Sequence, residues 1–136
     1  MGAEANSYVL DSYAILAYVG GEKGEARVRE VLDQARAGRC RTFLSVINLG
    51  EVAYIVERER GAAKAGETLG LVDQLPIDVL PATKEAVLSA AHIKAKFPIA
   101  YADAFAVAAA QILGATVLTG DPEFDSVKQL IAVEQI

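Results

Sequence analysis

Short apolar runs alternate with longer helical patterns along the whole chain, and this alternation constrains the fold more than any other feature. The runs fall at 8–10, 41–44, 77–80 and 115–120, with a fifth inside 129–136. They are apolar throughout rather than at every second position, which is typical of strands covered on both faces. The sequence therefore predicts the α/β class, as a three-layer α/β/α sandwich with a central parallel sheet of about five strands.

The helical segments carry recognisable start and stop signals. Ser45 and Thr83 stand where their hydroxyl oxygens can accept from the free backbone N–H groups of the helices that follow. Gly20, Gly38 and Gly114 come at the ends of helical patterns and are expected to terminate them.

Composition indicates one globular unit. Hydrophobic residues make up 53% of the 136 residues, and the absence of Trp means that Ala, Val, Leu and Ile must build the core. Such a composition argues against disorder, and a chain of this length is expected to form a single domain over 1–136. Cys40 is the only thiol, so no disulfide can form within the chain, which suits a reducing compartment.

No targeting or membrane segment is indicated. The first residues lack a basic region followed by a long apolar run. The most apolar stretch, 100–118, is interrupted by Asp103, Gln111 and Gly114, which makes it a poor membrane span. We therefore expect a cytoplasmic protein without a membrane partner.

Five acidic residues stand out once the fold class is considered. Asp11 directly follows the first predicted strand, and Asp121 follows the fourth. Asp103 opens a helix, Glu51 lies on the apolar stripe of another helix, and Asp125 comes four residues after Asp121. In open parallel sheets, ligands bind beyond the carboxyl ends of the strands. These acids are therefore expected to converge at one edge of the sheet.

Each acid also has a plainer interpretation. Asp11 can cap the helix that follows it, and Asp103 can sit in a first turn favoured by the helix dipole. Asp121, before Pro122, can belong to a surface turn, although the proline also favours an extended backbone at Asp121. Glu51 is harder to explain in this way, because an unpaired carboxylate is costly to bury. If these plainer interpretations all held, four unrelated acids would have come to one edge of one sheet by coincidence. A shared site is the simpler explanation.

Clustered carboxylates repel one another unless they share protons or bind cations. Oxygen ligands without a Cys or His motif favour the hard ions Mg²⁺ or Mn²⁺, and the lone His92 is expected to be a core or surface residue. Two such ions roughly 4 Å apart suit phosphodiester hydrolysis, in which one ion activates water and the other stabilises the leaving oxygen.

The net charge of −5 argues at first against a phosphate-rich partner. Without the five acids above, however, 13 acidic residues remain against 13 Lys and Arg. Two divalent ions would therefore make the bound form nearly neutral. Basic candidates for contacts with a nucleic acid are Arg39, Arg41, Lys94 and Lys96.

Three segments resemble a known family when they are taken in order: YVLDSYAILAYV, SVINLGEVAYIV and YADAFAVAAAQILGATVLTGDPEFDSV. Their order and spacing are similar to those of PIN domains, and the short chain resembles the ribonuclease toxin of a VapBC-type toxin–antitoxin pair. The similarity spans 8–133. It implies a PIN-like sandwich, an RNA substrate, a separate antitoxin partner and a homodimer.

The resemblance also implies roles for individual residues. The positions that match the family's acids are Asp11, Glu51, Asp103 and Asp121, which would bind Mg²⁺ or Mn²⁺ and support RNA cleavage. Asp125 would be an auxiliary acid near the ions. The Thr119 and Ser12 hydroxyls would orient an acid or a water, although either can equally be a helix cap or turn bond.

Other functions remain open. A haloacid-dehalogenase-type phosphotransferase needs a second Asp two residues after the first, and Tyr13 occupies that place. The serious alternative is an interaction module that keeps the fold and its acids but has little or no nuclease activity. The helical stretch 46–65 could supply contacts to a protein partner, and an acidic pocket would suit an incoming Arg.

Overall fold

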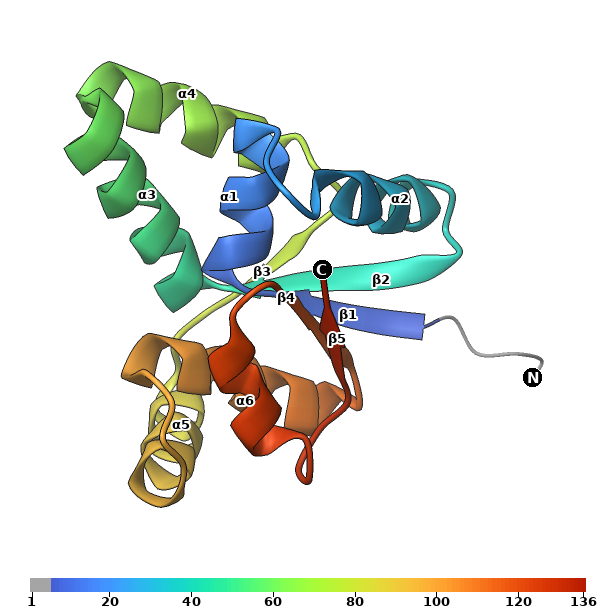
Figure 1. The fold of residues 1–136 in the computed structure, drawn as a ribbon, viewed down its shortest axis with the longest axis vertical. Helices are drawn as coiled ribbons and strands as arrows, with labels where there is room; N and C mark the ends of the chain where they lie inside the picture. The colour runs from blue at the N-terminus through green and yellow to red at the C-terminus, as the bar shows by residue number, and fades with distance from the viewer. Residues whose placement is uncertain (1–5) are drawn as a thin grey trace.

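The structure is a computed structural model that describes residues 6–136 (Figure 1). Its strands are β1 (Asn6–Leu10), β2 (Cys40–Ser45), β3 (Asp78–Leu80), β4 (Thr116–Thr119) and β5 (Val133–Gln135). Its helices are α1 (Ser12–Gly20), α2 (Glu25–Arg36), α3 (Val46–Arg60), α4 (Ala62–Asp73), α5 (Lys84–Lys96), α6 (Tyr101–Leu113) and the 3₁₀ helix η1 (Pro122–Val127). Within this part of the chain, no helix is long and apolar enough to cross a membrane.

The five strands form one parallel sheet, as predicted, and their order is β3-β2-β1-β4-β5. The chain builds outward from β1 to β3 and then returns to the other side of β1 with β4 and β5. The strand order therefore reverses between β1 and β4, which pair so that Leu10 lies beside Leu118. Ligands of open α/β sheets bind outside the carboxyl ends of the strands at such a reversal.

Helices cover both faces of the sheet, which confirms the three-layer arrangement (Figure 1). Helices α1 to α4 lie on one face, and α5, α6 and η1 lie on the other. Each face has its own hydrophobic core: the first core lies under α1 to α4, and the second lies under α5, α6 and η1. On β1, Tyr8 and Leu10 contribute to the first core, whereas Val9 contributes to the second. Because both sets of side chains are buried, the strand has to be apolar throughout.

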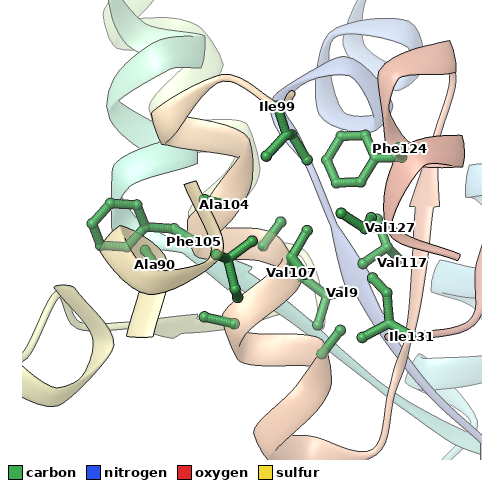
Figure 2. Close-up of a cluster of buried hydrophobic side chains, with 14 of the residues drawn as sticks. Val9, Ala90, Ile99, Ala104, Phe105, Val107, Val117, Phe124, Val127 and Ile131 are labelled. Carbon is green, nitrogen blue, oxygen red and sulfur yellow. The ribbon is translucent and has the colours of Figure 1, made fainter. Parts of the chain in front are cut away.

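The second core is built largely on the alanine-rich helix α6. Figure 2 shows Val107 of this helix near Val9 and Val117 of the sheet, with Phe124 and Ile131 on the other side of the cluster. Small side chains let α6 lie close to the sheet, and the larger ones fill the remaining space. This packing holds the first turn of α6 beside the carboxyl ends of β1 and β4.

The predicted helix signals are found in the structure, with small shifts of the boundaries. The Ser45 hydroxyl accepts from the Ile47 N–H at 3.2 Å, and the Thr83 hydroxyl accepts from the Ala86 N–H at 3.1 Å. Gly114 follows α6 in the left-handed conformation, at φ 63°. α1 extends through Gly20 rather than stopping before it.

The segment after β4 differs from the predicted surface turn. It forms η1, in which Phe124 and Val127 are fully buried in the core on α6. Their three-residue spacing matches the three residues per turn of a 3₁₀ helix, so both point to the same side. Asp121 stands just before Pro122 in an extended conformation, at φ −88° and ψ 117°, as the proline predicts.

Candidate metal centre at the edge of the sheet

Four acids from four different elements gather where the strand order reverses. Asp11 lies between β1 and α1, Asp121 lies between β4 and η1, Glu51 belongs to α3 and Asp103 belongs to α6. Asp11 and Asp103 are buried, with 1% and 7% of their surface exposed, and the other two are partly buried. Besides burial, the charges of Glu51 and Asp121 raise the pKa values of both Asp11 and Asp103, and the charge of Asp11 also raises that of Asp103. We call these four residues the acid cluster.

Asp11 is both a helix cap and a member of the acid cluster. Its Oδ1 accepts from the Ala14 N–H at 2.8 Å, which is the capping bond, and its Oδ2 accepts from the Thr119 hydroxyl at 2.5 Å. Burial nevertheless raises the pKa of Asp11 to about 7, with further increases from the charges of Asp121 and Glu51. The two hydrogen bonds oppose this shift only in part.

Thr119 connects two of the acids. It is fully buried at the end of β4, where its hydroxyl donates to Asp11 and accepts from the Asp121 N–H at 2.9 Å. The hydroxyl therefore fixes one carboxylate and the backbone that carries another. Ser12 is buried at the start of α1, and no hydrogen bond joins its hydroxyl to the acid cluster in residues 6–136.

Asp103 lies in the first turn of α6, where the helix dipole alone would favour its charged form. Its pKa is nevertheless raised to about 7, mainly by burial and then by the charges of Asp11, Glu51, Asp121 and Glu123. Desolvation and repulsion therefore outweigh the dipole. A carboxylate in this position needs a proton or a cation as compensation.

The two aspartates of the segment after β4 have different surroundings. Asp121 caps η1, because its Oδ1 accepts from the Glu123 N–H at 2.9 Å. Asp125 is exposed, and its carboxylate contacts the Lys128 ammonium at 3.1 Å and the Gln135 amide at 3.3 Å. The structure therefore places Asp121 in the acid cluster and leaves Asp125 outside it, at the surface.

Two polar residues next to the acids do not stand out in the sequence. Asn48 is fully buried and donates to Glu51, and Gln135 donates to the backbone oxygen of Asp121 at 3.0 Å. A signal for Asn48 does exist, because it precedes Val52 by four residues and so falls on the buried stripe of α3. Gln135 has no local signal, since its contact depends on β5 lying beside β4.

The acid cluster has the chemistry of a site for a hard cation. It offers only carboxylate oxygens, and within the described residues no Lys, Arg or His forms an ion pair with any of its four members. Their charges raise the pKa values of Asp11 and Asp103. In residues 6–136 no three such side chains are arranged around a common point.

The remaining titratable candidates take no part in this arrangement. His92 is exposed on α5, as one of the two predicted possibilities. Cys40 is buried at the start of β2, and its thiol donates to the Val31 carbonyl at 3.4 Å. Neither residue offers an activated nucleophile beside the acids.

Comparison with known proteins agrees with the fold. The PIN domain family matches residues 8–130 of the sequence. The chain belongs to the PIN domain family. No curated protein is similar enough in sequence to count as a match.

Several solved structures share the fold of this PIN domain. VapBC from Salmonella typhimurium, bound to DNA, is 20% identical, with a TM-score of 0.74 over 96% of this chain and 98% of that chain. VapBC2 from Rickettsia felis, bound to a promoter DNA fragment, is 14% identical, with a TM-score of 0.73 over 95% and 98%. Mycobacterium tuberculosis VapC20, a sarcin-ricin loop cleaving toxin, is 17% identical, with a TM-score of 0.68 over 88% and 94%. At these identities the likeness establishes a common fold.

Proposed function

We propose that this PIN domain is a metal-dependent endoribonuclease and that the acid cluster is its catalytic centre. The observation that carries the proposal is the burial of Asp11 and Asp103 beside two further acids, without a basic partner in the described chain. Such an arrangement stores repulsion that a divalent cation would relieve. The position at the reversal of strand order supports the same conclusion.

Carboxylates from the strand ends and from two helices would hold Mg²⁺ or Mn²⁺. Asp11 and Asp121 would approach from the ends of neighbouring strands, with Glu51 and Asp103 on the helices α3 and α6. Bound divalent ions would supply an activated water and charge stabilisation for in-line hydrolysis of a phosphodiester. The Thr119 hydroxyl would keep Asp11 and the Asp121 backbone in place. Asp125 would act from the rim, after leaving Lys128.

Lys94 and Lys96 are the best placed of the predicted basic contacts for RNA. They end α5, and a short connection leads from them to the first turn of α6 with Asp103. Arg39 and Arg41 are less suitable, because they lie at the start of β2, whereas the acids lie beyond carboxyl ends. Arg41 also pairs with Asp78 at 3.3 Å.

We further propose that the nuclease is the toxin of a toxin–antitoxin pair. The likeness to VapBC structures supports a separate protein partner. A groove of about 400 Å³ between α1, α3 and α4 offers a place for it, with Leu16, Val19 and Ile55 on its apolar side and Glu59 and Arg60 at its polar side. This groove overlaps the stretch 46–65 that the sequence indicates for partner contacts.

A homodimer belongs to the same proposal. Leu88 on α5 and Ile112 on α6 expose 58% and 70% of their surface, and Leu113 is exposed beside them. Exposed apolar side chains on two packed helices are a common feature of association surfaces. Sedimentation equilibrium of the purified chain would measure the association directly, with a monomer at all concentrations as the contrary result.

The test of the proposed activity is cleavage of a mixed RNA pool by the purified chain in Mg²⁺ or Mn²⁺. We expect cleavage that EDTA abolishes and that the double variant Asp11→Asn, Asp121→Asn lacks. The matched control is Asp33→Asn, which changes an exposed acid of α2 and should leave cleavage intact. No cleavage by folded, metal-saturated protein across several RNA classes would instead favour the interaction module.

A further inference from the structure

We infer that Asn48 is a positioning residue, which holds Glu51 in the acid cluster and ties it to the helix that carries Asp103. The inference rests on the proposed metal centre and adds a residue to it. Asn48 stands in the first turn of α3, one turn before Glu51, and is fully buried. It does not itself belong to the acids that would contact an ion.

The two hydrogens of the Asn48 amide reach two different helices. One N–H donates to Glu51 Oε1 at 3.1 Å, within α3, and the other donates to the Ala102 carbonyl of α6 at 3.2 Å. Ala102 immediately precedes Asp103 in the chain. A single side chain therefore links the Glu51 carboxylate to the backbone next to the Asp103 carboxylate.

The chemistry of the neighbours requires the amide in this orientation. Both partners, a carboxylate oxygen and a backbone carbonyl, are acceptors, so only the NH₂ group can satisfy both. A flipped amide would put its oxygen against two other oxygens. Asp, although nearly the same shape, has no donor to offer when ionised and would add a fifth negative charge.

The contact acts against a force that is present in the acid cluster. Glu51 is partly buried, and its charge is among those that raise the pKa values of Asp11 and Asp103. Repulsion from those carboxylates favours Glu51 conformers that turn toward solvent. The bond from Asn48 favours the conformer that stays with the other acids.

A purely structural role explains Asn48 poorly. Its Oδ1 is buried without a hydrogen-bond partner within the described residues, which opposes folding. Asn is also a weaker helix former than Ala. The side chain is better explained by what its two N–H groups hold in place than by a net gain in stability.

The test is Mn²⁺ binding, measured by calorimetry on the full chain, for wild type and Asn48→Ala. We expect the dissociation constant of the variant to rise about 10-fold or more, which is the usual effect of removing a residue that orients a metal ligand. The melting temperature in EDTA should fall only modestly, because removal of the unpaired Oδ1 partly offsets the loss of two hydrogen bonds. Asn48→Ser, with a smaller change in volume and one donor, should bind Mn²⁺ with intermediate affinity.

Two comparisons separate positioning from general damage to the fold. Thr42→Val removes another buried side-chain hydrogen bond, from β2 to the Pro76 carbonyl, and should leave Mn²⁺ affinity unchanged. In a Glu51→Ala background, Asn48→Ala should have much less further effect on Mn²⁺ affinity, because Glu51→Ala already removes the carboxylate that Asn48 holds.

The possible results are distinct. Equal Mn²⁺ affinity of wild type and Asn48→Ala, with both chains folded, would overturn the inference and leave the metal centre standing. Full additivity of Asn48→Ala and Glu51→Ala would also overturn it. A wild-type chain that binds no Mn²⁺ would overturn the metal centre, and the role of Asn48 with it.

Discussion

Asp11 and Asp103 show how the same residue can serve a local and a distant purpose. Asp11 caps α1, and Asp103 lies in the first turn of α6, so the plain interpretations of both describe real contacts or positions. Those interpretations do not account for burial beside other acids. Only the sheet topology, which joins residues far apart in sequence, produces the raised pKa values.

The raised pKa values predict an unusual pH dependence of stability without divalent ions. Asp11 and Asp103 have pKa values of about 7 in the folded chain and 3.8 as a reference. Between these values the folded chain binds more protons than the unfolded chain, so this contribution to stability falls as pH rises from about 4 to about 7. Urea unfolding in EDTA at several pH values would measure it.

The matched variant for this prediction is Asp103→Asn, which removes one titrating group and one repelling charge. We expect it to flatten the decline between pH 4 and 7 and to raise the melting temperature at pH 8 in EDTA. An unchanged pH profile in this variant would show that the charge of Asp103 is not the source of the effect.

Thr119 should matter for both folding and the metal centre. Thr119→Val keeps the shape but removes the hydroxyl that donates to Asp11 and accepts from the Asp121 N–H. A loss of about 1–3 kcal/mol in the free energy of unfolding is expected, because polar groups are left unpaired. Urea unfolding would measure the loss, and Thr119→Ser, which keeps the hydroxyl, should recover most of it.

At the scale of elements, α1 and β4 meet through a glycine. A Cβ built on Gly120 would overlap the Tyr13 ring, so a larger residue cannot fit without moving the ring. We expect Gly120→Ala to lower the free energy of unfolding by about 1–3 kcal/mol. Tyr13→Ala in the same chain should remove most of the added penalty.

Gly70→Ala is the control for that prediction. Gly70 lies in α4, and a Cβ there meets nothing within 4 Å, so the substitution should stabilise the helix by up to about 1 kcal/mol. Thermal unfolding of the two alanine variants would compare them directly. Destabilisation of both by the same amount would contradict the explanation from the Tyr13 contact.

Most elements could be predicted from local patterns. The signals for these elements lie within a few residues of each one. They are the apolar strands, the caps at Ser45 and Thr83, and the glycine after α6. η1 was harder to predict, because Pro122 and two aspartates are typical of a turn. What distinguishes it is the burial of Phe124 and Val127, which depends on the core beneath.

At the scale of the whole molecule, topology assembles the acid cluster. The sequence predicted that Asp11, Glu51, Asp103, Asp121 and Asp125 would converge at one edge of the sheet, and the first four do so. It did not predict that Asp125 would pair with Lys128, or that Asn48 and Gln135 would bond to this region. Those contacts depend on side-chain geometry and on the last strand, for which sequence spacing gives no information.

Binding of a divalent cation should reverse the pH dependence of the stability of the folded chain. At pH 8 Asp11 and Asp103 are mostly ionised, so Mg²⁺ should raise the melting temperature, whereas at pH 5 protons on these two residues compete with the ion. Thermal unfolding at the two pH values, with and without Mg²⁺, would measure the difference. An equal effect of Mg²⁺ at both would place the bound ion elsewhere.

We expect the acid cluster to bind the divalent ions of the proposed nuclease reaction. Crystals of the full chain soaked in Mn²⁺ would locate bound ions by anomalous diffraction. The expected result is density between the carboxylates of Asp11, Glu51, Asp103 and Asp121. Strong Mn²⁺ density only at another place, with these four side chains unliganded, would contradict it.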